Sequence, residues 1–332
     1  MAVHGRAARA RRRIRGRTLS DERQELLDEI RAGLAREQRE LPSRLFYDER
    51  GSRLFEEITR LPEYYLTRAE QALITDQVPS WIERHRPRSL VELGAGSALK
   101  TRPFLTAMHA DTGGVTYVPI DVSAEFLANT AERLREEHPR LTVRPVAATF
   151  IRALELVGSL PGPVLLTFLG STIGNFARDA AVDLLRRVGN VMQPDDRFIL
   201  GVDLRKDAAT LEAAYNDARG VTAEFNLNIL RVMNDEFGAD FDPGAFRHSA
   251  VYNRDVHCIE MHLVSTAAQS VSVPGIGTID LGKGETIRTE ISCKYDRQVV
   301  QEMFAAAGLD LLEWRQDSDG MFALSLAGRQ AA

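Results

Sequence analysis

The sequence predicts an α/β fold, a parallel sheet covered by helices and interrupted by a second lobe. From Ser89 onward, short β-rich apolar runs alternate with amphipathic helical stretches, and strands joined by crossover helices form parallel sheets. Between Lys206 and about Gly284 this rhythm lapses into helical patches, turns and an alternating strand. The 332 residues, 44% of them apolar, are enough to bury such a core.

The expected elements follow in chain order. An apolar stripe at helical spacing predicts a first helix from Asp21 to Glu37. A segment rich in aromatic and charged residues comes next, LPSRLFYDERGSRLFEEITRLPEYYLTRAE. Five strands are then expected at SLVELGAG, VTYVPIDV, LTVRPVAA, GPVLLTFLG and DRFILGVDL. Helices are expected at AEFLANTAERLREE, DAAVDLLRRVGNVM and DRQVVQEMFAAAG, and LDLLEWRQDSDGMFALSLA predicts a closing pair of strands.

These patterns suggest domain boundaries. Residues 69–204 and 295–332 form the parallel-sheet domain, and residues 18–68 and 205–294 form the second lobe. Residues 1–17 carry seven arginines and no acid, which is typical of a disordered basic tail. Such a tail can bind nucleic acid or anionic lipid. Because the whole chain has a net charge of −5 and offers no second basic patch, we expect a solvated segment instead.

Composition excludes several classes of site. The two cysteines do not form a CxxC pair, and the seven histidines show no spacing typical of a metal site. No apolar run reaches the length of about 18 residues that a membrane span needs, and no signal peptide is visible. We therefore expect a cytoplasmic monomer without a structural disulfide, zinc, membrane contact or nucleic-acid partner.

The turn after the first strand carries the features of a cofactor site. VELGAGSALKT places Gly94 and Gly96 where missing side chains let a cofactor approach the backbone. A dinucleotide-binding fingerprint would need a third glycine at position 99, which is Leu99. Glu92 precedes the glycines and Asp121 ends the second strand, a layout typical of class I methyltransferases that use S-adenosylmethionine (SAM). Asp121 would then bind the ribose hydroxyls, with a helix N-cap as its alternative role.

Four motifs identify a family: FYDERGSRLFEEITRLPEYYLTRAE, VELGAGSALKT, FLGSTIGNF and TEISCK. In this order and spacing they resemble the histidine Nα-methyltransferases of ergothioneine biosynthesis, from about Leu41 to Leu326. The resemblance implies a class I, Rossmann-like SAM methyltransferase whose substrate lobe is made from the N-terminal segment and the insertion. It also implies the reaction, conversion of L-histidine to Nα,Nα,Nα-trimethylhistidine (hercynine) by successive methyl transfers from SAM.

Individual residues match the family's functional positions. The candidate catalytic residues are Tyr47, a possible proton relay, and Asn175. The candidate histidine-binding residues are Tyr64, Asn175, Tyr215, Glu290, Ser292, Met261 and Phe55. The candidate SAM-binding residues are Gly94, Lys100, Asp121, Thr149 and Phe150. Within these sets, Glu290 and Ser292 match the pair that reads the imidazole, and Asn175 and Tyr215 the pair that holds the polar end of the amino acid.

Two departures from the family pattern bear on these assignments. Thr149 stands where the family has an acid that contacts the adenine, so that contact becomes a neutral hydrogen bond. Leu66 replaces the proline of the family's PEYYPT motif, next to Tyr64.

Other roles stay open for several positions. Read without the resemblance, Glu290 would be a solvent-facing strand acid, Tyr215 and Met261 would be core residues, and Asn175 would cap a helix. At the level of function, the alternatives are a related methyltransferase for another amino acid and a degenerate protein that binds SAM without catalysis. A nucleic-acid methyltransferase would need a basic groove, which the body of the chain lacks.

Overall fold

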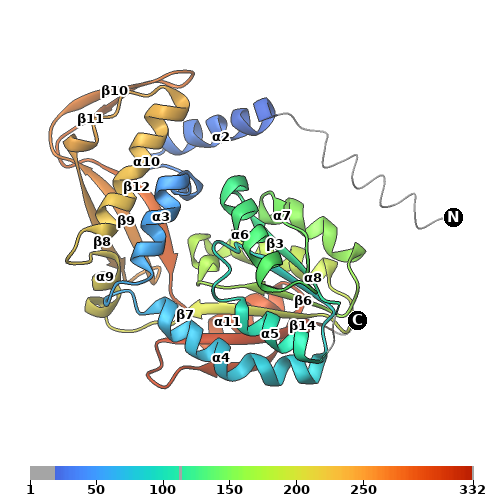
Figure 1. Cartoon of the computed structure of the whole chain (residues 1–332). Coiled ribbons are helices and arrows are strands. Elements are labelled where there is room, and N and C mark those ends of the chain that lie inside the picture. The colour runs from blue at the N-terminus through green and yellow to red at the C-terminus, as the bar shows by residue number, and fades with distance from the viewer. Residues whose placement is uncertain (1–18, 112–113, 331–332) are drawn as a thin grey trace. The chain divides into compact units, whose positions relative to one another are not determined.

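The computed structural model describes residues 19–111 and 114–330, which divide into two compact units (Figure 1). Unit 1 comprises the described residues up to Ile58, together with Tyr215–Val251 and Glu260–Ile291. Unit 2 comprises Thr59–Ala214, Tyr252–Ile259 and the described residues from Ser292 on. The expected basic tail at 1–17 lies outside the described residues. The assignment of a ligand to each lobe stays a prediction.

Unit 2 is built on a mostly parallel sheet in the order β13-β14-β7-β6-β2-β3-β4, with β5 also pairing with β3. The parallel strands are β2 (Ser89–Leu93), β3 (Thr116–Asp121), β4 (Thr142–Val143), β5 (Val146–Ala147), β6 (Val164–Phe168) and β7 (Arg197–Asp203). The predicted strand LTVRPVAA is split into β4 and β5, because Pro145 between them has no N–H to donate to a neighbouring strand. The strand order reverses at β2, where ligands bind in folds of this kind.

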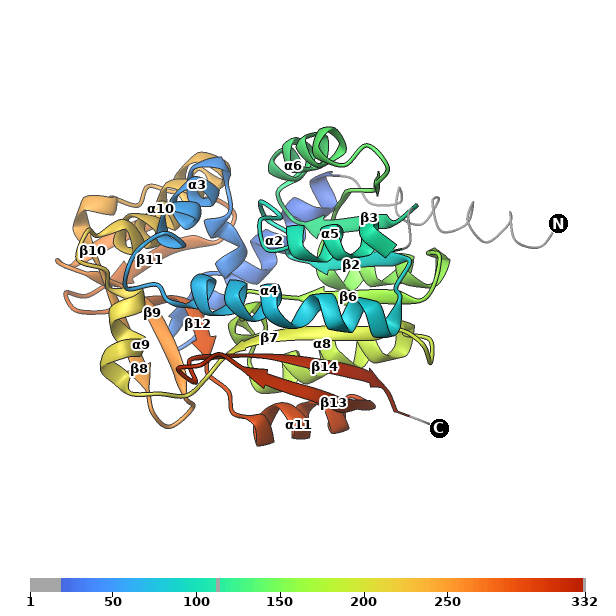
Figure 2. The ribbon, with the colours of Figure 1, turned by 60° about the horizontal axis from the view of Figure 1, so that its bottom comes forward.

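An antiparallel pair closes the sheet of unit 2. β13 (Leu309–Gln316) and β14 (Phe322–Arg329) form the predicted closing strands, and β14 lies between β13 and β7 (Figure 2). The α/β class I methyltransferase fold that the sequence predicts is thereby confirmed. The antiparallel insertion of the last strand was not specified by the sequence pattern.

Helices pack on both faces of this sheet. α8 (Arg178–Val191) and α11 (Arg297–Ala306) share one core with inward residues of β2, β6 and β7. On the other face, α4 (Leu66–His85) packs against α5 (Arg102–Asp111) and against β14 (Figure 2). The remaining helical segments of unit 2 are α6 (Ala124–Glu137), α7 (Phe150–Ala153), η2 (Leu154–Ser159), η3 (Thr172–Asn175) and α9 (Ala208–Tyr215), whose last residue, Tyr215, belongs to unit 1. α6, α8 and α11 match the predicted helices.

Unit 1 combines a small sheet with three helices. Most of its sheet, which has the order β1-β12-β9-β8, is made of β1 (Arg39–Glu40), β12 (Thr286–Cys293), β9 (Cys258–Ser265) and β8 (Phe246–Asn253). The two end residues of β8 (252–253), β9 (258–259) and β12 (292–293) are counted with unit 2. A separate hairpin pairs β10 (Gln269–Val273) with β11 (Gly277–Leu281). Its helical segments are α2 (Leu19–Leu34), η1 (Ser43–Phe46), α3 (Glu49–Ile58), α10 (Val221–Phe237) and η4 (Pro243–Ala245) (Figure 1). The predicted first helix is therefore present, but it ends at Leu34, three residues before Glu37.

The expectation of no structural disulfide is wrong. Cys258 and Cys293 are bonded to each other within unit 2, although 35 residues separate them in sequence. The β9 and β12 strands that carry them are neighbours in the sheet, a proximity that cysteine spacing does not reveal. In the described part of the chain, no group of three or more His, Cys, Asp or Glu could hold a metal ion, and no helix is long and apolar enough to span a membrane.

Candidate active site

The glycine turn after β2 has the geometry of a cofactor site. Gly94 has a φ of +75°, which side-chain-bearing residues rarely adopt, and it is exposed. A Cβ on Gly94 would lie 3.6 Å from the ring of Phe150, so the structure brings together two of the predicted SAM-binding residues. Phe150 itself packs on Phe168 and Phe176, with ring centroids 5.1 and 6.4 Å away. This corner of unit 2 therefore combines an apolar group of rings with the exposed backbone of Gly94.

Asp121 is held in place by main-chain donors. Its Oδ2 accepts a hydrogen bond from Gly96 N at 3.0 Å, and its Oδ1 accepts one from Ser123 N at 3.1 Å. The carboxylate therefore sits at the end of β3 against the glycine turn. Each oxygen of a carboxylate can accept about two hydrogen bonds, so Asp121 keeps acceptor capacity for ribose hydroxyls.

Glu92 has a structural role that its position in the motif does not show. The side chain is fully buried, and Thr101 Oγ1 and Tyr117 OH each donate to its Oε2 at 2.5 Å. Burial raises the pKa of Glu92 to about 7 despite these hydrogen bonds. Glu92 therefore holds Thr101 and Tyr117 by hydrogen bonds in the protein interior, next to the glycine turn.

The predicted SAM residue Lys100 is paired with an acid that the sequence analysis did not single out. Lys100 Nζ donates to Glu70 Oε2 at 2.5 Å, and the completely buried Glu70 also accepts from Gly170 N at 2.7 and 2.9 Å. A Cβ on Gly201 would collide with Glu70 Oε1, so glycine is required in β7 at this point. Glu70 is the acid of the LTRAE motif, so the motif contained it. An acid on a helix usually faces solvent, however, and burial was therefore not expected.

Thr149 and Leu66, the two departures, lie at helix starts. Thr149 is the exposed residue that precedes α7, and its hydroxyl makes no capping bond. Leu66 is the first residue of α4 and is buried. A proline is well tolerated at such a first helical position, so leucine there keeps the same helix start.

Asn175 and Ser292 are brought together within unit 2. Asn175 is the last residue of η3, which follows β6. A Cβ on the preceding Gly174 would lie 2.7 Å from Cys293 O, so the two backbones nearly touch. Ser292, next to Cys293, is buried. Tyr64 is also a buried residue of unit 2, and its carbonyl accepts from Arg68 Nη1 at 3.4 Å.

Beneath Ser292 lies a buried polar group of unit 2, which we call the lysine cluster: Tyr65, Asp203, Lys206 and Lys294. Lys294 Nζ lies 2.9 Å from Asp203 Oδ2, and Lys206 Nζ lies 2.6 Å from Asp203 Oδ1. Tyr65 OH donates to Asp203 Oδ1 at 2.8 Å. Burial lowers the pKa of Lys206, while Asp203 opposes that shift. None of these residues was predicted, although Lys294 closes the TEISCK motif.

In unit 1, the predicted aromatic residues gather around a residue that the sequence analysis missed. Tyr47 and Phe55 each lie 6.0 Å, centroid to centroid, from Phe225 of α10 and from each other. The FYDERGS motif builds this cluster, because Asp48 Oδ1 accepts from Gly51 N at 2.6 Å and from Asn228 Nδ2 at 2.8 Å. The first of these bonds caps the start of α3.

A second network in unit 1 holds Tyr215. The Tyr215 carbonyl accepts from His248 Nε2 at 2.8 Å, and Asn226 Nδ2 lies 2.8 Å from His248 Nδ1. Asn226 Oδ1 accepts from Thr289 Oγ1 at 2.6 Å, and that hydroxyl also lies 3.1 Å from Met261 O. Because Thr289 precedes Glu290, this network joins the segments that carry Tyr215, Met261 and Glu290.

Glu290 lies just before an irregular point of β12. Buried and half-buried residues alternate from Thr286 to Thr289, but Glu290 and Ile291 are both half-buried. Met261 in the neighbouring β9 is buried. Glu290 therefore continues the half-buried side of β12 that Thr286 and Arg288 share, and the break in the alternation falls at Ile291, after Glu290.

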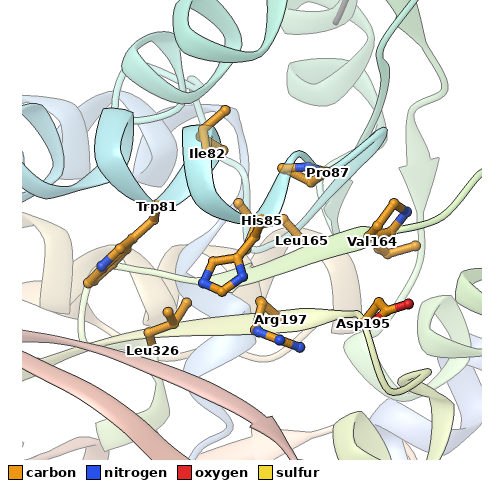
Figure 3. A pocket seen from close by; sticks show the side chains of 10 residues that line it. Trp81, Ile82, His85, Pro87, Val164, Leu165, Asp195, Arg197 and Leu326 are labelled. Atoms are coloured by element: carbon orange, nitrogen blue, oxygen red, sulfur yellow. The ribbon is translucent and has the colours of Figure 1, made fainter. Parts of the chain in front are cut away.

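The enclosed cavity of unit 2 is too small for a substrate. It lies between α4 and strands β6, β7 and β14, has a volume of about 10 Å³, and is bordered by Trp81, His85, Leu165, Arg197 and Leu326 among others (Figure 3). Such a volume holds about one water molecule. This cavity is therefore not the site of a SAM or histidine molecule.

Comparison with known proteins identifies the family. A family model described as histidine-specific, SAM-dependent methyltransferase matches residues 26–329. The chain belongs to this family. The methyltransferase is 41% identical over 302 residues to the histidine N-alpha-methyltransferase of Mycobacterium tuberculosis (strain CDC 1551 / Oshkosh), covering 91% of this chain and 94% of that relative.

Two further relatives show the breadth of the similarity. The histidine N-alpha-methyltransferase of Mycolicibacterium smegmatis (strain ATCC 700084 / mc(2)155) is 41% identical over 304 residues, covering 91% of this methyltransferase and 94% of the relative. A 4-dimethylallyltryptophan N-methyltransferase of Penicillium roqueforti (strain FM164) is 27% identical over 305 residues, covering 86% and 89%. The predicted enzyme class and the use of SAM are confirmed by the family.

Proposed function

We propose that this methyltransferase adds three methyl groups in succession to the α-amino nitrogen of L-histidine, giving hercynine. Family membership supports a histidine substrate and SAM as methyl donor. The structural observation that supports the proposal is the close approach of Gly174 to the backbone of Cys293 within unit 2, next to Asn175 on one side and Ser292 on the other. Residues proposed for the two ends of the amino acid thus come from adjoining segments.

The residues at the strand ends of unit 2 fit SAM. SAM supplies a methyl group on a positively charged sulfur, ready for transfer to a nitrogen lone pair. Asp121 would bind the ribose hydroxyls, Gly94 would let the cofactor approach the backbone, and Phe150 would cover its apolar part. Thr149 is exposed and would make a neutral hydrogen bond to the adenine, while Lys100 stays bound to Glu70.

Recognition of the imidazole falls to Glu290 and Ser292. The Glu290 carboxylate would accept a hydrogen bond from one ring nitrogen, and the Ser292 hydroxyl would serve the other, with Met261 packing nearby. Phenylalanine or leucine would offer neither group a ring nitrogen to bind. A site of this kind can discriminate by about 10⁴-fold or more.

The amino end of the substrate requires a deprotonated nitrogen. An α-amine with a pKa of about 8 is mostly protonated at neutral pH, and each unit costs about 1.4 kcal/mol to overcome. Asn175 and Tyr215 would hold the polar end, and Tyr47 would relay the proton. The faces of Phe55 and Tyr64 would stabilise the positive charge that stays once the nitrogen is methylated.

The deciding experiment incubates the full chain with SAM and a panel of free amino acids and reads the products by mass. We expect L-histidine to be converted to its trimethylated form, with the mono- and dimethylated forms as intermediates. Preferred transfer to tryptophan or a prenylated tryptophan would establish the alternative, a relative with another substrate. Tight SAM binding without any transfer would establish the degenerate alternative. The monomeric state and the cytoplasmic location stay predictions.

A further inference from the structure

The bond between Lys294 and Ser292 constrains how Ser292 can use its hydroxyl group. Lys294 Nζ lies 2.9 Å from Ser292 Oγ, and the Lys294 side chain has no exposed area. An ammonium group carries three donors and no acceptor. At this contact Ser292 must therefore accept, and its own hydrogen must be directed to a different partner.

The same contact changes the strength of the hydroxyl. A hydroxyl oxygen that accepts from an ammonium is polarised, so its O–H becomes a better donor and its oxygen a poorer acceptor for a further hydrogen bond. Lys294 is itself fixed, because Asp203 Oδ2 holds its Nζ at 2.9 Å. The lysine cluster thus fixes the orientation of the Ser292 hydroxyl through Lys294.

We propose that Lys294 is a positioning residue that makes Ser292 a hydrogen-bond donor toward the substrate ring, so that the enzyme binds neutral imidazole in preference to imidazolium. The inference rests on the proposed function, in which Ser292 faces one ring nitrogen and Glu290 the other. A neutral imidazole offers one N–H for Glu290 and one bare nitrogen that accepts from Ser292. An imidazolium has two N–H groups, and Ser292 is a poor acceptor for the second.

Other charged and titratable groups surround Lys294. Besides the lysine cluster and Glu290 on the same strand, Lys294 acts electrostatically on Tyr252 and Tyr295, and its backbone N–H contacts His257. Further charges act on these neighbours: Arg205 and Arg254 on Tyr252, Arg178 on Tyr295, and Asp317 on Lys206. Burial raises the pKa of Tyr252 and of Tyr295. The His257 ring lies 3.1 Å from Tyr252 OH, and its carbonyl accepts from Lys294 N. The test must therefore separate an effect of the protein's own groups from an effect of the ligand's ring.

The test measures binding by calorimetry to the full chain saturated with S-adenosylhomocysteine, between about pH 5.5 and 7.5. The two ligands are L-histidine and β-(1,2,4-triazol-3-yl)-L-alanine, whose ring stays neutral in this range. For the wild type we expect the Kd of histidine to rise about tenfold per pH unit below about pH 6.5, where the imidazole gains a proton. The Kd of the triazole should stay nearly constant. An equal rise for the triazole would place the titration on the protein and overturn the inference.

Substitutions then locate the cause. In Lys294→Met, the Kd of histidine should rise by less than about threefold per pH unit below about pH 6.5. Binding at pH 7.5 should also weaken, by about three- to tenfold. Lys294→Arg, which keeps a charged donor, should restore the rise. The matched control is Lys206→Met, which removes a charge from the same cluster without touching Ser292, and it should keep the wild-type rise. An equal reduction in both methionine variants would mean that charge alone acts, and would overturn the positioning role.

Two further measurements complete the design. SAM affinity and thermal melting report whether each variant folds, and if Lys294→Met does not fold, Ser292→Ala should reduce the acid-side rise in its place. In a Ser292→Ala background, Lys294→Met should cost less than about twofold in affinity if it acts through Ser292. If these variants bind histidine normally and its Kd rises toward acid pH as in the wild type, the inference is overturned and the proposed function is not affected. Failure of the wild type to bind histidine overturns the proposed function, and the inference with it.

Discussion

The proposed SAM corner of unit 2 (Gly94, Asp121 and Phe150) and the Tyr215 network of unit 1 fix their candidate residues by different means. In unit 2, Gly94 and Asp121 are placed by the backbone, through a positive φ in one case and main-chain N–H donors in the other. In unit 1, Tyr215 is placed by side chains, through His248, Asn226 and Thr289.

This difference determines what a change can do in each region. A backbone-built site depends on a few adjacent residues and tolerates change elsewhere. A side-chain network fails at any member, because a buried donor or acceptor that loses its partner costs about 1–3 kcal/mol. Unit 1 should therefore be sensitive at positions that never touch a ligand.

The largest expected effect comes from a strict backbone requirement within unit 1, at Gly51. In Gly51→Ala, the added Cβ would collide with the carbonyl oxygen of Phe46, so η1 and α3 would have to move apart. We expect a loss of about 3 kcal/mol or more in the free energy of unfolding, measured by urea denaturation.

The matched control for this change is Gly282→Ala, also in unit 1. Its Cβ would meet nothing closer than Glu285 at 3.6 Å, an ordinary contact. It should change stability by less than about 1 kcal/mol. Equal effects of the two substitutions would show that the close approach at Gly51 is not real.

The next effect concerns recognition. Glu290→Ala removes the proposed acceptor for the imidazole N–H and opens space for a larger side chain. Catalytic efficiency for L-histidine should fall by at least about 10²-fold, while transfer to larger aromatic amino acids falls less or rises. Steady-state kinetics with both substrates measure the change, and SAM affinity should stay close to that of the wild type. Unchanged efficiency with histidine would mean that Glu290 does not read the ring.

The contrast between the two regions also explains how much the sequence could predict. The parallel sheet, its helices and the SAM corner follow from local patterns, because strand periodicity and a glycine turn are encoded by neighbouring residues. For that reason Gly94, Asp121 and Phe150 all lie at the carboxyl ends of parallel strands, after β2, at the end of β3 and after β5. Even here Pro145 divided a strand, and the closing antiparallel pair could not be placed without knowledge of the whole sheet.

Networks between distant residues could not be predicted in this way. Asn226 and Thr289 are 63 residues apart, and Tyr65 and Asp203 are 138 apart. The disulfide between Cys258 and Cys293 was missed for the same reason. The resemblance to a family supplied Glu290 and Ser292, but it did not supply Lys294, which acts beneath them.

A smaller effect tests the backbone-built corner. Asp121→Ala removes a carboxylate that can bind two ribose hydroxyls, so SAM affinity measured by calorimetry should fall by a free energy of about 1.5–3 kcal/mol. Histidine affinity should change less. If both ligands weaken equally, Asp121 acts by holding the turn at Gly96 and not by binding the ribose.

The smallest effect tests the side-chain network through pH. Burial lowers the pKa of His248 below its ordinary value of 6.5. As pH falls below about 6.5, the unfolded chain therefore gains a proton at this position before the folded chain does. Stability that is fully present above that pH is then lost, by up to about 1.4 kcal/mol per pH unit, until the folded pKa is reached.

Two substitutions separate this titration from the loss of hydrogen bonds. His248→Gln can still donate to Tyr215 O and accept from Asn226 but cannot titrate, so urea denaturation should show a shallower loss of stability toward acid than in the wild type. His248→Ala leaves both partners without His248 and should cost about 2 kcal/mol already at neutral pH. Since burial lowers the pKa of His262 and of His85 as well, an acid slope that is unchanged in His248→Gln would assign the titration to one of these two residues. Such a result would also show that the Tyr215 network does not depend on the charge of His248. The contrast between the backbone-built region and the side-chain-built region would then rest on the hydrogen bonds of Asn226 and Thr289.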